Sequence, residues 1–278
     1  MKVAVIGASG LLGQALMREW SRDEVVGLSS RDVDIRDAGK VREVIGKLCP
    51  EWIVLSAAYT DVDGCESHQD LALSVNRDGA VNVGVAAKEV GAKLLFLSSD
   101  YVFDGKKSSP YEAGDARNPQ SVYGRSKSEA EVRLLELLPQ SCIARTSWLF
   151  GTGGKCFPDT ILKLAASRPV LDVVNDQHGC PTYSLDLARG IIELCRRNAG
   201  GIVHATNAGN CSWFEFAREI VSAAGLSTDV RPVSTQQMPR PARRPAYSVL
   251  SPKSLEQWGI AMPTWQDALR RYLQERKS

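Results

Sequence analysis

Short hydrophobic runs alternate with longer segments of helical period through the first half of the chain. Runs of this length that are rich in Val, Ile and Leu predict buried strands, and the amphipathic segments between them predict helices. The predicted strands are residues 2–6, 24–28, 52–56, 93–98 and 141–146, and the predicted helices are 11–20, 37–48, 68–90 and 121–138. Strands and helices in this order predict βαβ units, and therefore an α/β fold with a doubly wound parallel sheet.

The pattern changes after residue 147, where glycines at 151–154 and several prolines divide the chain into short pieces. We interpret 1–147 as a dinucleotide-binding region and 148–278 as a smaller C-terminal substrate-binding lobe. A helix and a strand within 184–206 are predicted to rejoin the large sheet. A last amphipathic helix is predicted at 265–276.

Composition excludes several classes of partner. A net charge of +2 over 278 residues, with no basic stripe, gives no reason to expect nucleic-acid binding. The longest apolar runs have the length of strands and no leader is visible, so we expect a cytoplasmic protein without a membrane partner. Seven widely spaced cysteines without a CxxC pair, and three isolated histidines, predict neither a disulfide framework nor a metal site.

A glycine-rich loop of spacing GxxGxxG joins the first predicted strand to the first helix. Glycines there allow close approach of a dinucleotide diphosphate, which backbone N–H groups and a helix N-terminus can bind. This position indicates a Rossmann-like site. The loop residues expected to bind cofactor are Gly7, Ser9, Gly10, Leu11, Leu12 and Gly13.

The second strand ends without an acidic residue, where an NAD-preferring fold usually carries one against the ribose. The sequence therefore favours NADPH, with NADH as the alternative. Arg31 is placed to meet a 2′-phosphate and Ser29 or Ser30 to hydrogen-bond it, although Arg31 is equally consistent with an exposed turn. Asp34 and Ile35 are placed to meet the adenine, unless Asp34 only caps a helix.

Two more loops follow strands at the same sheet edge, where doubly wound folds bind ligands. After the third strand, Ala57, Ala58 and Tyr59 would let the backbone approach the cofactor. After the fourth strand, the Ser99 hydroxyl is placed to bind a carbonyl oxygen as charge develops on it.

Tyr123 and Lys127 lie four residues apart in the next predicted helix, so they share one face. A free phenol has a pKa of about 10, and a neighbouring cation would bring it toward the working range. The spacing indicates a proton-delivery pair at a hydride-transfer site, and its alternative is a solvated helix face.

Seven collinear runs make the chain resemble the dTDP-4-dehydrorhamnose reductase family of extended short-chain dehydrogenases/reductases. They are GASGLLG at 7–13, AAYTDVD at 57–63, SSDYVF at 98–103, VYGRSK at 122–127, RTSW at 145–148, NDQHGCPT at 175–182 and PARRP at 241–245. The first four fit many sugar-nucleotide enzymes, whereas the last three are particular to this family.

The resemblance implies that Tyr123 is the proton donor and that Lys127 holds the nicotinamide ribose and lowers the tyrosine pKa. Ser99 stands where the family usually has Thr and keeps the hydroxyl. Some relatives bind a metal ion across a dimer interface through a Glu, and this chain has Gln14 at the corresponding stretch. We therefore expect no metal ion. The expected oligomeric state is a monomer or a homodimer. The substrate residues implied are Val62, Asp100, Tyr123, Trp148, Asn175, Gln177, Arg243 and Arg244.

The function that the resemblance implies is reduction of the 4-keto group of dTDP-4-dehydro-L-rhamnose by NADPH, with a proton from Tyr123. One alternative is a reductase of another nucleotide-linked 4-keto-deoxysugar. A second is a non-catalytic regulatory subunit, because that of methionine adenosyltransferase resembles this chain in fold and in a run like 98–101.

Overall fold

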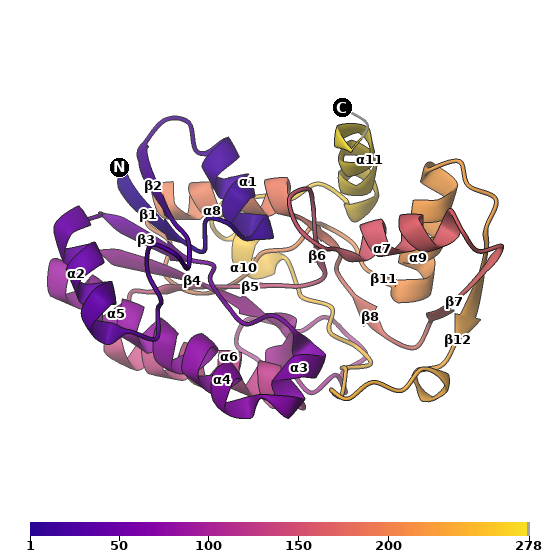
Figure 1. Cartoon of the computed structure of the whole chain (residues 1–278), viewed down its shortest axis with the longest axis horizontal. Coiled ribbons are helices and arrows are strands. Elements are labelled where there is room, and N and C mark those ends of the chain that lie inside the picture. The colour runs from indigo at the N-terminus through magenta and orange to yellow at the C-terminus, as the bar shows by residue number, and fades with distance from the viewer. Residues whose placement is uncertain (277–278) are drawn as a thin grey trace.

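The computed structural model describes residues 1–276 and contains a six-stranded parallel sheet of order β10-β5-β4-β3-β1-β2 (Figure 1). The predicted α/β doubly wound fold is confirmed. The strands of this sheet are β1 (Lys2–Ile6), β2 (Glu24–Leu28), β3 (Trp52–Leu55), β4 (Lys93–Ser99), β5 (Cys142–Thr146) and β10 (Gly201–His204).

Helices cover both faces of the sheet (Figure 1). Successive side chains of β1 point to opposite faces, so Val3 and Val5 belong to one apolar core and Ala4 and Ile6 to the other. On the first face lie α1 (Leu11–Glu19) and α8 (Ser184–Arg196), and on the second lie α2 (Ala38–Leu48), α5 (Ala80–Val90) and α6 (Val122–Leu137).

The strand order reverses beside β1, because the chain passes from β1 to β2 on one side and returns to β3 on the other. In doubly wound sheets a crevice opens at the carboxyl ends of the strands at such a point. The register brings three of these ends level: Ile6 of β1 pairs with Leu55 of β3, which pairs with Phe96 of β4. The loops that follow these strands therefore converge on one edge.

The single helix predicted at 68–90 is wrong in detail. The structure has α3 (Val62–Ser67), α4 (Gln69–Leu73) and then a π-helical turn, η1 (Ser74–Gly79), before α5. The reason is Asn76, whose buried amide accepts from the backbone N–H of Tyr59 (2.7 Å) and donates to its carbonyl (3.0 Å). The wide turn lets this side chain hold the 57–59 loop.

The elements from residue 149 onward include four that lie beside the sheet in Figure 1: α7 (Phe157–Ala165), α9 (Trp213–Ala223), and the parallel pair β7 (Val170–Val174) and β12 (Asp229–Val233). They share a core cluster with β1, α1 and α8. Because the apolar core is continuous across residue 147, it does not mark a domain boundary there, and the predicted division into two parts stays a prediction. The other elements are β6 (Leu149–Phe150), β8 (His178–Gly179), β9 (Thr182–Tyr183), β11 (Cys211–Ser212), α10 (Lys253–Glu256), α11 (Trp265–Glu275) and the 3-10 turns η2 (Asp100–Val102) and η3 (Thr235–Gln237).

Across residues 1–276, the structure contains no helix that combines the length and the apolar character of a membrane span.

Candidate active site

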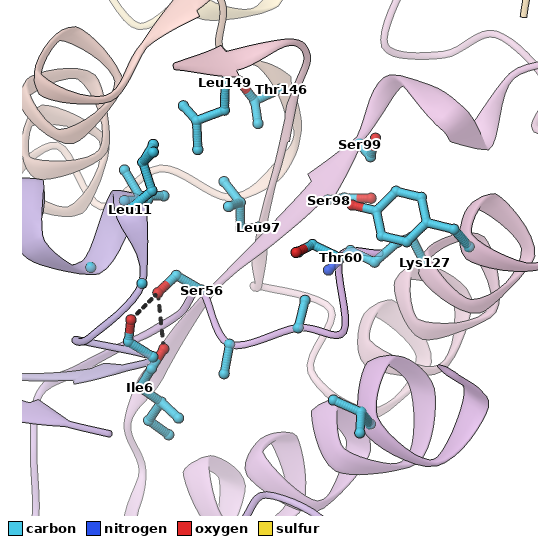
Figure 2. Close-up of a pocket in the computed structure, with 18 of the residues that line it drawn as sticks. Ile6, Leu11, Ser56, Thr60, Leu97, Ser98, Ser99, Lys127, Thr146 and Leu149 are labelled. Carbon is cyan, nitrogen blue, oxygen red and sulfur yellow. Dashed lines mark hydrogen bonds between the residues drawn. The ribbon is translucent and has the colours of Figure 1, made fainter. Parts of the chain in front are cut away.

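A cleft of about 820 Å3 opens at the carboxyl edge of the sheet. Figure 2 shows its two sides, with Ser99 and Lys127 on one and Leu11 on the other. Most of the residues singled out in the sequence line it: Gly7, Ser9, Gly10, Leu11, Leu12, Gly13, Ser30, Asp34, Ile35, Ala57, Ala58, Val62, Ser99, Asp100, Tyr123, Lys127 and Trp148. Those that do not are Arg31, Tyr59, Asn175, Gln177, Arg243 and Arg244.

The glycine loop is packed so closely that side chains are excluded. Gly7 has φ +95°, and a Cβ added there would lie 2.5 Å from the backbone N of Ala57. A Cβ on Gly13 would lie 2.1 Å from the carbonyl oxygen of Gly7. Gly10 is the N-cap of α1 and offers no side-chain cap, which leaves the first N–H groups of that helix available. This cradle fits a dinucleotide diphosphate.

The Ser56 hydroxyl fastens the first strand to the loop after β3. It donates to the carbonyl of Ile6 (3.0 Å) and, at 3.5 Å, to that of Gly7 (Figure 2). These hydrogen bonds tie the loop after β3 to the end of β1 and the start of the glycine loop.

Asp34 lines the cleft, and its contact with the adenine stays a prediction. Its carboxylate accepts three hydrogen bonds from the Arg36 guanidinium, the shortest 2.6 Å, and this pairing holds the pKa of Asp34 below its ordinary value. Arg36 lines the cleft and was missed in the sequence, although it lies only two residues on. Arg31 is exposed outside the cleft lining, so its contact with a 2′-phosphate stays a prediction.

Helix α6 carries Tyr123 and Lys127 in its first two turns. It begins after Ser121, whose hydroxyl accepts from the backbone N–H of Gly124 (3.1 Å). Lys127 is only 2% exposed, and its Nζ lies 4.1 Å from the centroid of the Phe96 ring. Burial lowers the pKa of Lys127 to about 7, while the negative charge of Glu131 opposes this shift.

Tyr123 is half-buried, and burial raises the pKa of its phenol above the ordinary value. The hydroxyl of Ser99 is the neighbour that lowers that pKa. The Tyr101 ring meets Tyr123 edge to face, with centroids 5.7 Å apart. A phenol in these surroundings is protonated at neutral pH, as a proton donor must be. Lowering of the pKa by Lys127 stays a prediction.

Asp100 lies at the base of the cleft and is 1% exposed. Its Oδ1 accepts from the Ser99 hydroxyl (2.9 Å), whereas Oδ2 has no hydrogen-bond partner among residues 1–276. Burial raises the pKa of Asp100 to about 6, and the hydroxyls of Ser248 and Ser99 offset only part of that effect.

A buried ion pair behind the cleft was not foreseen from the sequence. The Glu131 carboxylate, fully buried, accepts from Nη2 of Arg145 (2.6 Å), from the Ser98 hydroxyl (2.5 Å) and from Arg117 (3.1 Å). Glu131 is one helical turn beyond Lys127, and Ser98 precedes Ser99. Glu131 therefore connects the helix that carries Lys127 to the strand that carries Ser99. Only the i, i+4 spacing from Lys127 could have signalled it.

Asn175 and Gln177 contact protein groups outside the cleft lining. Asn175 Oδ1 accepts from the Ser212 hydroxyl (2.7 Å), and Gln177 Nε2 donates to the Thr235 hydroxyl (2.9 Å). Their contact with a sugar nucleotide stays a prediction.

The two arginines of the 241–245 run differ in their surroundings. Arg244 donates to the Tyr101 hydroxyl (2.8 Å) and to Asp63 (3.2 Å), so its guanidinium is held by the protein. Arg243 is exposed, and its side chain makes no hydrogen bond or ion pair with a described residue. Arg243 is thus the guanidinium of the pair that is open to a ligand.

A second loop, residues 151–155, faces the glycine loop across the mouth of the cleft. Gln14 joins the two, because its Nε2 donates to the carbonyls of Ser9 (2.9 Å) and Gly153 (2.8 Å). Lys155 lines the cleft and has no ion pair within residues 1–276. No group of three or more His, Cys, Asp or Glu side chains in that range is arranged to hold a metal ion.

Comparison with known proteins gives full-length matches. The family model described as RmlD substrate binding domain matches residues 1–278. The spore coat polysaccharide biosynthesis protein SpsK of Bacillus subtilis (strain 168) is 42% identical over 279 residues, which cover 100% of this chain and 98% of that protein. A dTDP-4-dehydrorhamnose reductase of Sinorhizobium fredii is 38% identical, over 98% of this chain and 96% of its own length.

Two further matches bear on ligands. A protein of Streptomyces niveus named dTDP-4-keto-6-deoxy-D-glucose reductase is 36% identical, over 95% of this chain and 94% of its own length. The crystal structure of the dTDP-4-dehydrorhamnose reductase of Bacillus anthracis in complex with NADP superposes with a TM-score of 0.96 at 39% identity, and covers 99% of this chain and 100% of that one.

Proposed function

This chain belongs to the RmlD substrate-binding-domain family, and on that premise we propose that it reduces the 4-keto group of dTDP-4-dehydro-L-rhamnose to give dTDP-L-rhamnose. The chain is an NAD(P)H-dependent oxidoreductase by family, and NADPH is the reductant that we assign to it. The observation that carries the proposal is the meeting in one cleft of the glycine cradle at 7–13 with Ser99, Tyr123 and Lys127.

The protein residues divide the chemistry between binding and proton delivery. Bound NADPH supplies the hydride. Tyr123, protonated because burial raises the pKa of its phenol, donates the proton to the sugar O4. Ser99 now donates to Asp100, and rotation of its hydroxyl would direct the same proton to the substrate oxygen.

Lys127 acts as a buried cation beside the cofactor ribose. Burial opposes its charge and lowers its pKa to about 7. The negative charge of Glu131 favours the protonated amine. Protonated Lys127 can then hydrogen-bond the ribose and favour proton release from Tyr123.

Phosphate groups need cations that the protein does not already use. Of the basic residues that line the cleft, Arg36 is paired with Asp34 and Lys127 is buried, which leaves Lys155 open beside the glycine loop. We assign Lys155 to the cofactor diphosphate and Arg243 to the sugar nucleotide diphosphate. Both cations are exposed and can reorient on binding.

The alternative substrate is another nucleotide-linked 4-keto-deoxysugar. The Streptomyces niveus relative, named for reduction of dTDP-4-keto-6-deoxy-D-glucose, supports it. The two candidate sugars differ in ring stereochemistry, and Trp148 and Asp100, which line the cleft, are the side chains that we expect to discriminate between them.

The direct test follows NADPH oxidation at saturating cofactor with enzymatically generated dTDP-4-dehydrorhamnose. The matched substrates are dTDP-4-keto-6-deoxy-glucose and the UDP and GDP keto-sugar analogues. We expect the first substrate to give the highest kcat/KM, and preference for the second would establish the alternative. Absence of oxidation with all of them would contradict an enzymatic role and support a binding module.

A variant tests the proton donor. Tyr123→Phe should lower kcat by at least about 100-fold while the NADPH Kd changes little, because only the hydroxyl is lost. The matched control is Tyr247→Phe, since Tyr247 is half-buried outside the cleft lining. An unchanged kcat in the Tyr123 variant would refute the mechanism.

The proposed location is the cytoplasm, and the proposed oligomeric state is a monomer or a homodimer. Seven free cysteines, six of them buried, support a reducing compartment.

A further inference from the structure

Trp148 has an unusual backbone conformation. Its φ is +46°, in the left-handed region that large side chains avoid, and such strain persists only where the surroundings enforce it. Trp148 lines the cleft directly after the buried Thr146 and Ser147. Its indole is therefore held in place at a functional position by contacts that can be identified.

The principal contact is with Trp213, the first residue of α9. The two indoles stack with centroids 3.5 Å apart and ring planes 6° from parallel. Trp213 is itself backed by Phe157, at a centroid distance of 4.5 Å. Trp213 does not line the cleft, so it touches the reaction chamber only through Trp148.

Gly179 closes a second side of the Trp148 indole. A Cβ added at Gly179 would lie 2.5 Å from both Cε2 and Nε1 of that ring. Gly179 belongs to β8, which pairs with β11, and β11 leads directly into α9 and Trp213. One small antiparallel pair thus positions both walls around the indole.

We propose that Trp213 is a positioning residue, which fixes the Trp148 indole as a rigid platform for the apolar face of the deoxysugar before the substrate arrives. This inference rests on the proposed function. Without Trp213, the strained Trp148 backbone relaxes, and the platform must form again during binding. The ordering cost then falls on substrate binding, because the hydride and proton donors lie elsewhere in the cleft.

The experiment compares Trp213→Leu and Trp213→Phe with the wild type and with Trp258→Phe, a partly buried tryptophan in another part of the core. We expect KM for the keto-sugar to rise about 5- to 10-fold in Trp213→Leu and less in Trp213→Phe. In both Trp213 variants, kcat at saturating substrate and the NADPH Kd should stay within about 2-fold of the wild type. Trp258→Phe should leave KM, kcat and the NADPH Kd unchanged.

Circular dichroism of the free enzyme supplies a readout that does not depend on activity. Stacked indoles give an exciton-coupled band, which should be present in the wild type and in Trp258→Phe and absent from both Trp213 variants. Absence of the band from the wild type would overturn the stacking. A wild type that shows the band but no turnover of any keto-sugar would contradict the proposed function instead.

Gly179→Ala keeps the test decisive if the Trp213 variants do not fold. The added Cβ displaces the indole from its edge and leaves Trp213 in place. A selective rise in KM supports the platform. An unchanged KM in a folded Trp213→Leu or Gly179→Ala protein, or a parallel loss of NADPH affinity, would refute the proposal.

Discussion

Replacing Asp100 by Asn should make the protein more stable at neutral pH. The side chain is 1% exposed, and burial raises its pKa to about 6 from an ordinary value of 3.8. Asn has the same shape and can still accept the hydrogen bond that Ser99 donates to Oδ1. The substitution removes a negative charge that burial disfavours. In the wild type, Oδ2 of that carboxylate has no hydrogen-bond partner among residues 1–276.

The size of the effect follows from the difference between the folded and unfolded pKa of Asp100. The pKa rises by about two units, and each unit corresponds to about 1.4 kcal/mol, so the wild type loses up to about 3 kcal/mol at neutral pH. Between pH 3.8 and about 6 the folded state binds more protons than the unfolded state, so this group makes stability fall as pH rises through that window. Below pH 3.8 the carboxyl is protonated in both states and the penalty vanishes.

Urea unfolding of wild type and Asp100→Asn at several pH values between about 4 and 8 measures this penalty. The difference in free energy of unfolding should be smallest near pH 4 and reach its full value above pH 6. The control is Asp104→Asn, because a hydrogen bond from the Tyr111 hydroxyl (2.8 Å) is the main cause that lowers the pKa of Asp104. That substitution should destabilise the protein near neutral pH.

A pH-independent difference between wild type and Asp100→Asn, or a loss of stability in the variant at pH 7.5, would show that Asp100 is not held with a raised pKa. If Asp100 contacts the sugar as proposed, the stabilised variant should also have a lower kcat/KM. Stability would then have been sacrificed for function at this position.

Three further variants test other parts of the site. Glu131→Gln should lower the free energy of unfolding, measured by urea titration, by about 3–5 kcal/mol, because it leaves Arg145 buried without its carboxylate. The control Glu129→Gln, on the same helix, should lower it by less than about 1 kcal/mol. Gly13→Ala should weaken NADPH binding at least about 10-fold by fluorescence titration, since its Cβ would lie 2.1 Å from a carbonyl oxygen of the glycine loop; an unchanged Kd would contradict the cradle. Lys155→Met should raise the NADPH Kd by about 3- to 10-fold at low ionic strength and less at high salt, and a salt-independent effect would argue against a diphosphate contact.

The sequence was sufficient for the parallel sheet and for most of the cleft. The periods of the strands and helices, and the position of the glycine loop after the first strand, depend on local rules that hold in any βαβ unit. The ends of β1, β3 and β4 then had to meet at one edge. The register Ile6, Leu55 and Phe96 realises that arrangement.

Contacts between residues far apart in the chain could not be predicted from the sequence. The spacing of Glu131 from Lys127 places Glu131 on the same helix face, but it does not indicate that the partner is Arg145, 14 residues on and in another element. The π-helical turn at Asn76 likewise depends on the Tyr59 backbone, which the helical periodicity of 68–90 does not report. The stacking of Trp148 on Trp213 joins residues 65 positions apart, and a lone tryptophan in a sequence gives no sign of its partner.

The continuous apolar core has a consequence for how the molecule could be divided. Val3 and Val5 of the first strand belong to the same cluster as Ile220 of α9 and Leu269 of α11. A fragment that stopped at residue 147 would therefore leave one sheet face open to water, and we expect it not to fold as an independent cofactor-binding module. Unfolding of the whole chain should be a single cooperative transition, so a substitution in α9 would change the melting of the glycine-loop half as well.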